Sequence, residues 1–461
     1  MTALHELGAL ELRERFRARE LSPVEVLEAC ATRIEETAEF NTFVTLALDE
    51  AREGAREAER AYAAGEAEER PLLGIPVAVK DLFDTAGLRT TYGSAMFARH
   101  VPRADAEVVA RLREAGALIV GKTSLFEFAW GISSQNTANG DCLNPWDAER
   151  SAGGSSGGSA AALALRQVPL ALGTDTAGSI RIPAAFCGVM GLKPTVGRLS
   201  AEGVFPLAPS LDHVGPMARR PEDIALAMGV LDGGHWRHCE RPPLRVAVWH
   251  GPPDPELDDD TAKALDAAAD ALVRQGGRVE RVSGLEVDDA VVPFATIQLV
   301  EALESHQARG LYPRRSDEYT PQIARRLERG RAVRLGDYLS AGTARRAIAS
   351  AFARLFRDWD ILLSPISPVP PPKLGEESEV RSGRARGLRD AVLGFTVPES
   401  IAGLPACAVR ASIGSDGLPR AVQIAGPRGS DRRVLAAAAM VWGDNPELQS
   451  IWPEPAVSSR T

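Results

Sequence analysis

The sequence predicts an α/β fold, because short apolar segments typical of buried strands alternate with helical segments in both halves of the chain. Residues 105–115 repeat apolar positions at helical spacing and lead through Gly116 into the apolar segment 117–120. The helical segment 159–166 leads in the same way into the strand-like segment 168–173. Hydrophobic residues make up 44% and charged residues 25% of the 461 positions, an ordinary balance for a globular protein with a sizeable core.

The first half of the chain begins with helices and then enters the sheet. Ser22-Pro23-Val24-Glu25 has the pattern of a capping box with proline in the first turn, which predicts a helix through LEACATRIEE. A second helix is expected over 48–64, where alanine, glutamate and arginine dominate. The apolar segment 74–79 predicts a buried strand that leads into Lys80.

The second half resumes the alternation after residues 232–243, a candidate linker rich in Gly, Pro, His and Cys. A strand is predicted at 244–249 and a helix at 261–274. Further strands are expected at 360–363, 404–411 and 421–425, the first two separated by a proline-rich loop.

Charge and cysteine content exclude several classes of protein. The net charge of −9 is thinly spread and basic residues form no stripe, so no nucleic-acid partner is expected. Five scattered cysteines without a C-x-x-C pair suggest neither a disulfide framework nor a zinc site, and they favour a reducing compartment. The start of the chain lacks an apolar secretory segment and no stretch reaches transmembrane length, so a cytoplasmic protein is expected.

Two catalytic motifs match by pattern alone and are rejected. Residues 116–123 match the Walker A pattern, but their centre has the composition of a buried strand instead of a flexible phosphate-binding turn. Gly153-Gly-Ser155-Ser-Gly157 matches the nucleophile elbow of Ser-His-Asp hydrolases, which must follow a strand. The preceding residues 144–150 are expected to form a polar turn instead, and neither His213 nor His306 has supporting context.

Two turns of small residues enclose one helix–strand unit. A glycine/serine tract is usually a flexible linker, but residues 151–159 run directly into an apolar helix and strand. A second turn, at 173–179, follows that strand at once. Glycines let backbone amides approach a ligand and serines supply hydroxyl groups, so the two turns can build a nucleophile with an oxyanion pocket.

These turns closely resemble the motifs of the amidase-signature family. The resemblance is carried by Gly153-Gly-Ser-Ser-Gly-Gly-Ser159, Gly173-Thr-Asp-Thr-Ala-Gly-Ser-Ile-Arg-Ile-Pro183 and Phe186-Cys-Gly-Val-Met-Gly-Leu-Lys-Pro194. It extends upstream to Gly74-Ile-Pro-Val-Ala-Val-Lys-Asp81, so that about 70–220 carries it strongly. The resemblance implies an amidase-signature fold, with a large mixed β-sheet core surrounded by α-helices. One domain over 1–461 is expected, with a helical N-terminal region at about 1–65 and a looser C-terminal half at about 244–445.

By this resemblance Lys80 is the general base, Ser155 the relay serine and Ser179 the acyl-forming nucleophile, with a cis peptide bond before Ser155. The roles are chemically consistent, because a serine hydroxyl needs a base to remove its proton during attack. A solvated lysine has a pKa of about 10.4, so burial must lower that pKa to near 7, a change worth about 4 kcal/mol. A random lysine beside Asp81 would more often belong to a surface ion pair, but its place in the motif favours catalysis.

The resemblance also implies an oxyanion hole in the second turn. Its donors would be the backbone N–H groups of Thr176, Ala177 and Gly178, together with that of Ser179. The family more commonly has glycine at position 177. If that position requires a positive φ, alanine there would be strained by about 1 kcal/mol.

Further residues are assigned supporting roles by the same resemblance. Ser156, Asp175 and Arg181 would hold the catalytic turns from behind. Ala129 and Trp130 resemble a loop that lines the substrate's acyl pocket, although Trp130 fits a core aromatic equally well.

The resemblance predicts an amidohydrolase that cleaves the C–N bond of a linear carboxylic amide through an acyl-enzyme. No metal or organic cofactor is implied, and the expected partner is a small-molecule amide, with no nucleic acid and no membrane, while a homodimer is left open. The alternative is the glutamine-hydrolysing A subunit of a tRNA-dependent amidotransferase, which shares these motifs and passes ammonia to a partner protein. A catalytically inactive member is disfavoured, because Lys80, Ser155 and Ser179 are all present.

Overall fold

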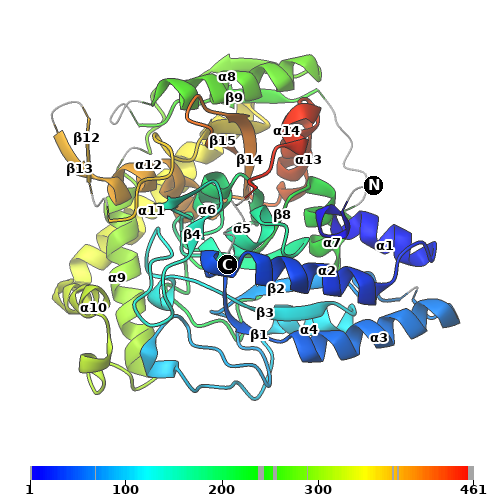
Figure 1. Ribbon diagram of the computed structural model, residues 1–461. Helices are drawn as coiled ribbons and strands as arrows, with labels where there is room; N and C mark the ends of the chain where they lie inside the picture. Colours follow the sequence, from blue (N-terminus) through cyan, green and yellow to red (C-terminus); the bar gives the residue numbers. More distant parts are fainter. Residues whose placement is uncertain are drawn as a thin grey trace.

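Strands from both halves of the chain join one mixed sheet of eleven strands in the computed structural model (Figure 1). The structure describes residues 3–67, 69–236, 243–252, 257–287, 289–375, 378–381 and 384–454, with the backbone alone described at 378–381 and 384–388.

The strands and helices follow one another in the order that the alternation predicts. The strands are β1 (Phe43–Leu46), β2 (Pro76–Lys80), β3 (Leu118–Thr123), β4 (Leu143–Asn144), β5 (Asp147–Ser151), β6 (Leu170–Asp175), β7 (Met190–Lys193), β8 (His213–Ala218), β9 (Arg245–Val248), β10 (Arg278–Arg281), β11 (Ile361–Pro365), β12 (Ser378–Arg381), β13 (Arg384–Gly387), β14 (Ala406–Ile413) and β15 (Pro419–Ala425). The α-helices are α1 (Ala9–Arg17), α2 (Pro23–Glu36), α3 (Leu48–Ala64), α4 (Glu107–Glu114), α5 (Gly157–Ala164), α6 (Arg181–Cys187), α7 (Pro221–Leu231), α8 (Asp259–Arg274), α9 (Val291–Ala308), α10 (Pro321–Ala332), α11 (Leu335–Asp358), α12 (Leu388–Ala402), α13 (Asp431–Gly443) and α14 (Pro446–Ser450).

The strand order places the two strands that carry candidate residues next to each other. The order is β1-β3-β2-β6-β8-β7-β14-β15-β11-β9-β10. β2 is parallel to both β3 and β6, and β9 is parallel to β10 and β11, while the other neighbours are antiparallel. Because β2 and β6 are parallel, their carboxyl ends, with Lys80 and Asp175, lie at the same edge of the sheet.

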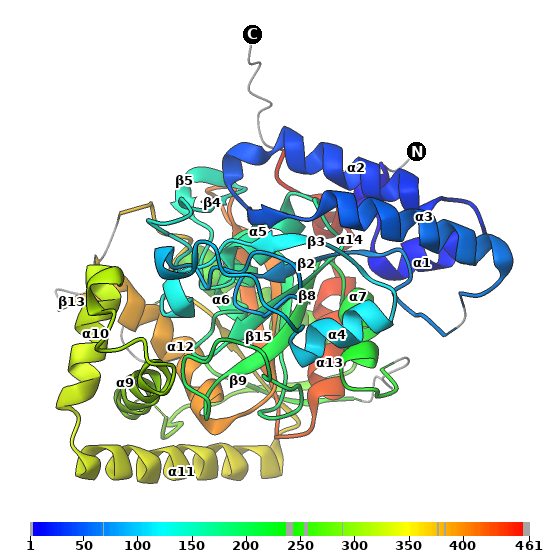
Figure 2. The ribbon, with the colours of Figure 1, turned by 90° about the horizontal axis from the view of Figure 1, so that it is seen from below.

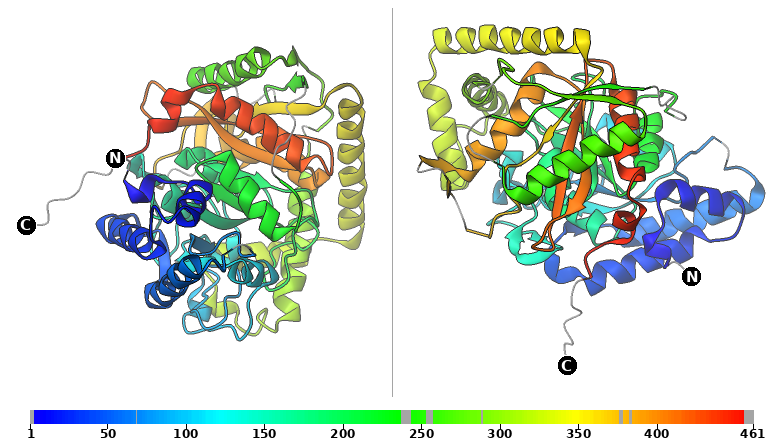
Figure 3. Two further views of the ribbon diagram at one scale, coloured as in Figure 1. Left: turned by 90° about the vertical axis from the view of Figure 1, so that its right-hand side faces the viewer. Right: turned by 90° about the horizontal axis from the view of Figure 1, so that it is seen from above.

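Side chains along β2 alternate between two apolar layers. Val77 and Val79 pack into a core with residues of α1, α4, α7, α8 and α13, whereas Ala78 packs into a core with α5 and α6. This alternation is typical of a strand whose two faces are both covered, and Figure 3 shows helices on both sides of the sheet. Lys80, two residues beyond Ala78, belongs by this alternation to the side of α5 and α6.

Local capping explains where two of the predicted helices begin. Ser22 Oγ accepts the N–H of Val24, and the Glu25 carboxylate accepts the N–H of Ser22, which completes the predicted capping box of α2. The Asp258 side chain caps α8 by accepting N–H groups of its first turn.

The remaining predicted elements are found within three residues of their predicted ends, but one prediction is wrong. Residues 144–150 were expected to form a polar turn, and they instead contribute to a two-stranded hairpin of β4 and β5. A distant segment holds this hairpin, since the Ser151 N–H donates to the Pro372 carbonyl. The predicted linker at 232–243 lies in part outside the described residues, which omit 237–242.

Helices α9, α10 and α11 form a corner at one edge of the molecule (Figure 2). Both α10 and α11 pack on α9. Five exposed arginines lie on or between α10 and α11, and two of them form ion pairs with Glu328 and Asp337. These arginines are Arg325, Arg329, Arg331, Arg334 and Arg346.

Candidate active site

Three separate segments carry the predicted triad to the carboxyl edge of β2. Lys80 is the last residue of β2, while Ser155 and Ser179 each lie two residues before a helix, α5 and α6 respectively. Both helices belong to the apolar layer on the Lys80 side of the sheet. Lys80 and Ser155 are fully buried and Ser179 is 6% exposed, so Ser179 is the member of the three with access to solvent.

Lys80 is held by two hydroxyl groups. Its Nζ lies 2.8 Å from Ser155 Oγ and 2.7 Å from Thr174 Oγ1. Burial lowers the pKa of Lys80 to about 7, against the opposing negative charges of Asp175 and Asp212. Near neutral pH a substantial fraction of Lys80 is therefore unprotonated, which is the state that a general base requires.

The turn that carries Ser155 is packed closely against a neighbouring loop. Ser134 Oγ donates to the Gly153 carbonyl at 2.9 Å. A Cβ atom at Gly154 would lie 1.8 Å from the Ser133 carbonyl oxygen, so only glycine fits there. The Gly154–Ser155 peptide bond is cis, as the resemblance predicts.

Asp175 organises the loop that carries Ser179. Its carboxylate accepts the N–H groups of Gly178 and Ile180, at 2.7 and 3.2 Å. Arg181 adds a fully buried ion pair, with Nε–Oδ2 of 3.0 Å and Nη2–Oδ1 of 3.1 Å. Burial by itself would raise the pKa of Asp175, but the Arg181 guanidinium outweighs it and holds that pKa well below its usual range. Asp175 is therefore a permanent anion around which the loop is folded.

The N–H groups of this loop divide into engaged and free donors. The Gly178 N–H is taken by Asp175. In the part of the chain that the structure describes, the N–H groups of Thr176, Ala177 and Ser179 have no hydrogen-bond acceptor. The N–H groups of Thr176, Ala177 and Ser179 are therefore free to donate to a ligand, whereas that of Gly178, also expected as a donor, is engaged.

Ala177 does not carry the strain that its replacement of glycine suggested. Its φ is not positive, and the positive φ of this loop, +128°, belongs to Gly178. A Cβ atom at Gly178 would lie 2.7 Å from Thr396 Oγ1, which itself donates to the Ala177 carbonyl. Glycine is therefore required at 178, and alanine at 177 costs no backbone strain.

Ser156 links the two catalytic turns. Its Oγ donates to the Thr174 carbonyl at 3.2 Å and accepts the Thr174 N–H at 3.3 Å. Its own N–H donates to the Ser179 carbonyl at 3.2 Å. The three residues expected to support the site, Ser156, Asp175 and Arg181, all contact the segments that carry the serines.

Ala129 and Trp130 lie in a buried loop, with 3% and 1% of their surfaces exposed. The Trp130 indole donates to Gln298 at 3.0 Å, and its carbonyl accepts a hydrogen bond from Arg326. Phe128 and Ala129 both have backbone angles in the left-handed region, with φ of 49° for Phe128 and 57° for Ala129. Trp130 packs here as a core aromatic, the alternative that the sequence left open.

The two rejected motifs differ in geometry from what they would require. Lys122 of the Walker A pattern lies in β3 and donates to one buried carbonyl and two threonine hydroxyls. His213 lies beside the Asp175 carbonyl, with Nδ1 at 3.0 Å from it, and makes no hydrogen bond to Ser155. Over the described ranges, no group of three His, Cys, Asp or Glu side chains is placed to hold a metal ion.

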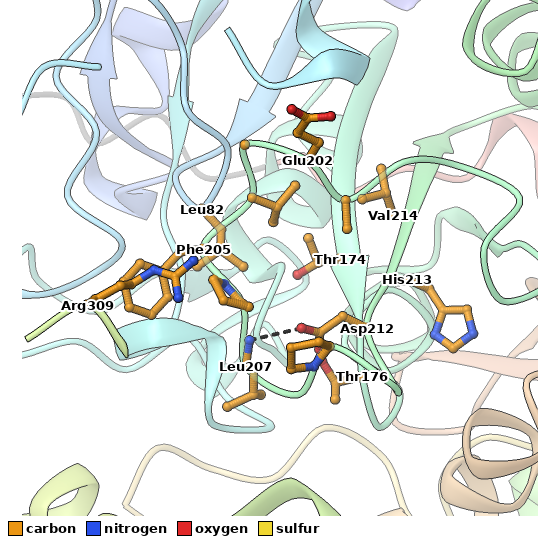
Figure 4. Close-up of a pocket in the computed structure, with 15 residues that line it drawn as sticks. Leu82, Thr174, Thr176, Glu202, Phe205, Leu207, Asp212, His213, Val214 and Arg309 are labelled. Atoms are coloured by element: carbon orange, nitrogen blue, oxygen red, sulfur yellow. Dashed lines mark hydrogen bonds between the residues drawn. The ribbon is translucent and has the colours of Figure 1, made fainter. Parts of the chain in front are cut away.

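A cavity of about 270 Å³ opens beside Thr174, whose hydroxyl contacts Lys80 (Figure 4). Thr176 and Asp212 also line this cavity, and the Asp212 carboxylate accepts the Thr176 hydroxyl at 2.6 Å. The sequence assigned no role to Thr174 or Asp212. The signal that could have found Thr174 is its place in β6 directly before Asp175.

Comparison with known proteins gives consistent results over nearly the whole chain. The Amidase family model matches residues 25–435. The A subunit of a glutamyl-tRNA(Gln) amidotransferase, from Geobacter sp. (strain M21), is 36% identical over 94% of this chain and 96% of its own length. A solved structure named amidase has a TM-score of 0.87 at 33% identity, covering 95% of this chain and 99% of its own. A structure of an s-triazine catabolic enzyme, described with a vestigial protein complex, has a TM-score of 0.87 at 35% identity, covering 95% and 98%.

These relatives contradict the partners expected from the sequence. A small-molecule amide and no nucleic acid were expected, whereas the Geobacter relative and others are named as subunits of an enzyme of glutamyl-tRNA(Gln). The expectation of no nucleic acid rested on the net charge of −9 and its thin spread along the sequence. In the described residues, no helix is long and apolar enough to cross a membrane.

Proposed function

The chain belongs to the amidase-signature family, and on that premise we propose that it hydrolyses a carboxamide through an acyl-enzyme on Ser179. Lys80 acts as the general base and Ser155 as the proton relay between Lys80 and Ser179. The observation that carries this proposal is the 2.8 Å contact between a fully buried lysine amine and the Ser155 hydroxyl. A lysine held in this way is available as a base near neutral pH, because burial disfavours its charged form.

Acylation begins when Ser179 Oγ attacks the carbonyl carbon of the amide. The proton of Ser179 passes to Ser155 as Ser155 gives its own proton to Lys80. The carbonyl oxygen gains negative charge, and the free N–H groups of Thr176, Ala177 and Ser179 donate to it, a contribution of several kcal/mol to the transition state. The C–N bond then breaks, and the departing nitrogen takes a proton back through Ser155.

Deacylation uses the same relay on water. A water molecule loses a proton to Ser155 as it attacks the acyl carbonyl, and the same N–H groups hold the second oxyanion. The ester bond to Ser179 breaks, Ser179 Oγ recovers a proton, and the carboxylic acid leaves. Lys80 returns to its unprotonated state, so the cycle consumes only amide and water.

We propose that a half-buried guanidinium beside the Trp130 loop, that of Arg326, receives a carboxylate of the substrate. Arg326 lies 5.7 Å from the Trp130 ring centroid and donates to the Trp130 carbonyl. Burial, with Arg389 and other nearby arginines, lowers the pKa of Arg326 to about 9. Arg326 is half-buried, and among the described residues no carboxylate acts on it to offset the cost of partly removing its charge from water. A substrate carboxylate would supply the missing charge.

We further propose that the amide is glutamine and that the chain acts as the A subunit of a tRNA-dependent amidotransferase. This role is supported by similarity that covers 94% of the chain and 96% of the Geobacter relative, including the C-terminal half. Glutamine carries both the carboxamide that the triad would cleave and a carboxylate for Arg326. Hydrolysis would release ammonia for a partner protein that amidates glutamyl-tRNA.

The test is ammonia release from glutamine and from a panel of uncharged amides, such as propionamide and benzamide. Wild-type protein is compared with Ser179→Ala and with Ser159→Ala, which changes a serine of the same motif, in α5, whose hydroxyl donates to the Leu172 carbonyl. We expect glutamine turnover that falls by about 10³-fold or more in Ser179→Ala and is largely kept in Ser159→Ala. A fluorophosphonate should label wild-type protein and Ser159→Ala but not Ser179→Ala.

The outcomes separate the chemistry from the physiological role. Equal ammonia release by wild-type protein and Ser179→Ala would overturn the triad. Turnover of uncharged amides alone, lost in Ser179→Ala, would leave the triad in place and contradict the amidotransferase role. Glutamine turnover that increases when glutamyl-tRNA and partner proteins are added would support that role.

A further inference from the structure

Asp212 occupies an unusual position beside the candidate active site. It precedes β8 and lines the 270 Å³ cavity together with Thr174 and Thr176 (Figure 4). One carboxylate oxygen accepts the Thr176 hydroxyl at 2.6 Å. The other accepts the N–H groups of Leu207 and Ala208, at 2.9 and 3.0 Å. Asp212 therefore connects the oxyanion loop, residues 176–179, to a segment more than thirty residues further along the chain.

The charge of Asp212 differs from that of Asp175 in one respect. Asp175 is neutralised by its buried ion pair with Arg181. In the described part of the chain no ion pair includes Asp212, whose carboxylate has only uncharged hydrogen-bond donors. Both carboxylates raise the pKa of Lys80, Asp175 more than Asp212, and Asp212 is the one without an ion-pair partner among the described residues.

We propose that Asp212 is a positioning residue of this site, which holds Thr176 in the oxyanion loop and places an uncompensated negative charge near Lys80. The inference deepens the proposed function and rests on it, because it assigns a role in the same acyl transfer. Asp212 does not touch the reacting atoms. It acts through Thr176 and through its charge.

The groups around Asp212 define what can be titrated there. Glu301 of α9 raises the pKa of Asp212 further, after burial as the main cause, to about 6. Arg309, at the end of α9, lines the same cavity. His213 is neutral, because burial lowers its pKa well below the usual value. Near pH 7 and above Asp212 is charged, and it is the one of these four groups that contacts Thr176.

A negative charge near Lys80 stabilises its protonated form, so it raises the pH at which Lys80 becomes a base. Removal of that charge should lower this pH. The rise of kcat/KM with pH, which reports the base in the free enzyme, should then move toward acid. The expected displacement is about half a pH unit or more, which corresponds to about 3-fold higher relative activity on the acid side.

The test uses the full-length protein and whichever amide it turns over, glutamine first. In Asp212→Asn the amide oxygen can keep the two backbone bonds while its NH₂ donates to the Thr176 hydroxyl, so shape is kept and charge is lost. Glu301→Gln is the matched control, because it removes a nearby carboxylate that acts on Asp212 and bonds Ser210 instead of Thr176. Thr176→Val removes the bond to Asp212. Because that hydrogen bond also lowers the pKa of Asp212, this variant is compared with wild-type protein by its kcat at about pH 9, where Asp212 is charged.

We expect the acid limb of kcat/KM to move to lower pH in Asp212→Asn and to stay in place in Glu301→Gln. In Thr176→Val, kcat should fall by about 10-fold, since the oxyanion donors lose their alignment. Superimposable pH profiles of wild-type protein and Asp212→Asn would overturn the charge role. An unchanged kcat in Thr176→Val would overturn the positioning role, even if Asp212→Asn fails to fold.

Failure of this inference can be distinguished from failure of the proposed function. If Ser179→Ala is inactive but Asp212→Asn and Thr176→Val behave as wild-type protein, the triad stands and the inference is wrong. If Ser179→Ala keeps full activity, the proposed chemistry itself is wrong and the Asp212 role goes with it.

Discussion

At the scale of single residues, the chain uses lysine and arginine for different tasks. It has five lysines, and three of them, Lys80, Lys122 and Lys193, are fully buried. Burial lowers the pKa of Lys80 and Lys193 to about 7 and of Lys122 to about 8. Arginine cannot lose its proton at such pH values, so the position that requires a base near pH 7 requires lysine. Most of the other cations of the chain are arginines.

Arg326 provides a test of substrate recognition at this scale. Arg326→Gln should raise the KM for glutamine by about 10-fold or more with a smaller change in kcat, because a hydrogen bond to a charged group contributes roughly 1.5–3 kcal/mol. Steady-state kinetics with glutamine and with propionamide would measure the effect.

Arg325→Gln is the control, since Arg325 lies next in sequence but is exposed. Only Arg326→Gln should affect glutamine, and neither variant should affect an uncharged amide. An equal loss with glutamine and propionamide would show that Arg326 supports the Trp130 loop instead of a substrate carboxylate.

At the scale of elements, the ion pair between Asp175 at the end of β6 and Arg181 at the start of α6 joins a strand to a helix. Arg181 also donates to Gln423 of β15 at 2.9 Å and to Ser400 of α12 at 2.6 Å. Arg181 thereby connects the loop that carries Ser179 to the C-terminal half of the chain. Because all of these groups are buried, the contacts act in a medium of low polarity, where an unpaired charge is costly.

Removal of this cation should therefore destabilise the protein strongly. Arg181→Met leaves the Asp175 carboxylate buried without its guanidinium partner, and we expect the free energy of unfolding to fall by about 3–5 kcal/mol. Urea denaturation followed by circular dichroism would measure it. The double variant Asp175→Asn/Arg181→Met removes both charges and should recover part of the loss. A double variant no more stable than Arg181→Met would argue against the uncompensated charge as the cause.

At the scale of the whole molecule, the buried lysines predict how stability depends on pH. Between about pH 7 and 8.5, unfolded lysines bind protons that the folded lysines lack. The unfolded chain then carries more protons, so stability should rise with pH, by up to roughly 1.4 kcal/mol per pH unit for each such lysine. Below pH 7 the lysines of the folded protein are protonated as well, so they no longer make stability depend on pH.

Other buried groups limit this window on both sides. Glu399 and Asp223, whose pKa values burial raises to about 7, favour the folded state at lower pH and lose that contribution as the pH rises to 7. Buried thiols such as Cys30 and Cys407, with pKa values raised to about 12, oppose the lysines once unfolded thiols ionise above about pH 8.5.

Urea denaturation at pH 7.0, 7.75 and 8.5 would test the prediction. The slope of the free energy of unfolding against pH should be positive for the wild-type protein. Lys193→Met removes one buried lysine and should reduce this slope by up to about 1.4 kcal/mol per pH unit. Lys193 is chosen because it lies outside the proposed triad. A flat or falling slope in the wild-type protein would mean that the buried lysines do not dominate this range.

The sequence by itself determined the local elements and the candidate residues. Capping residues and apolar periodicity placed α2, α3, β2 and β6, since these signals act between neighbours in the chain. The motif resemblance supplied Lys80, Ser155 and Ser179. It could not show which N–H groups of the oxyanion loop are free, because that depends on where the Asp175 carboxylate points.

Only the tertiary structure decided the contacts between distant segments. In the tertiary structure the Gly178 N–H donates to Asp175, and Ala177 has no positive φ. Asp212 contacts Thr176, and Arg326 contacts Trp130. The hairpin at 143–151 was missed for the same reason, since a segment more than two hundred residues away holds it. Such contacts depend on how layers pack against one another, and periodicity along a single chain carries no record of that packing.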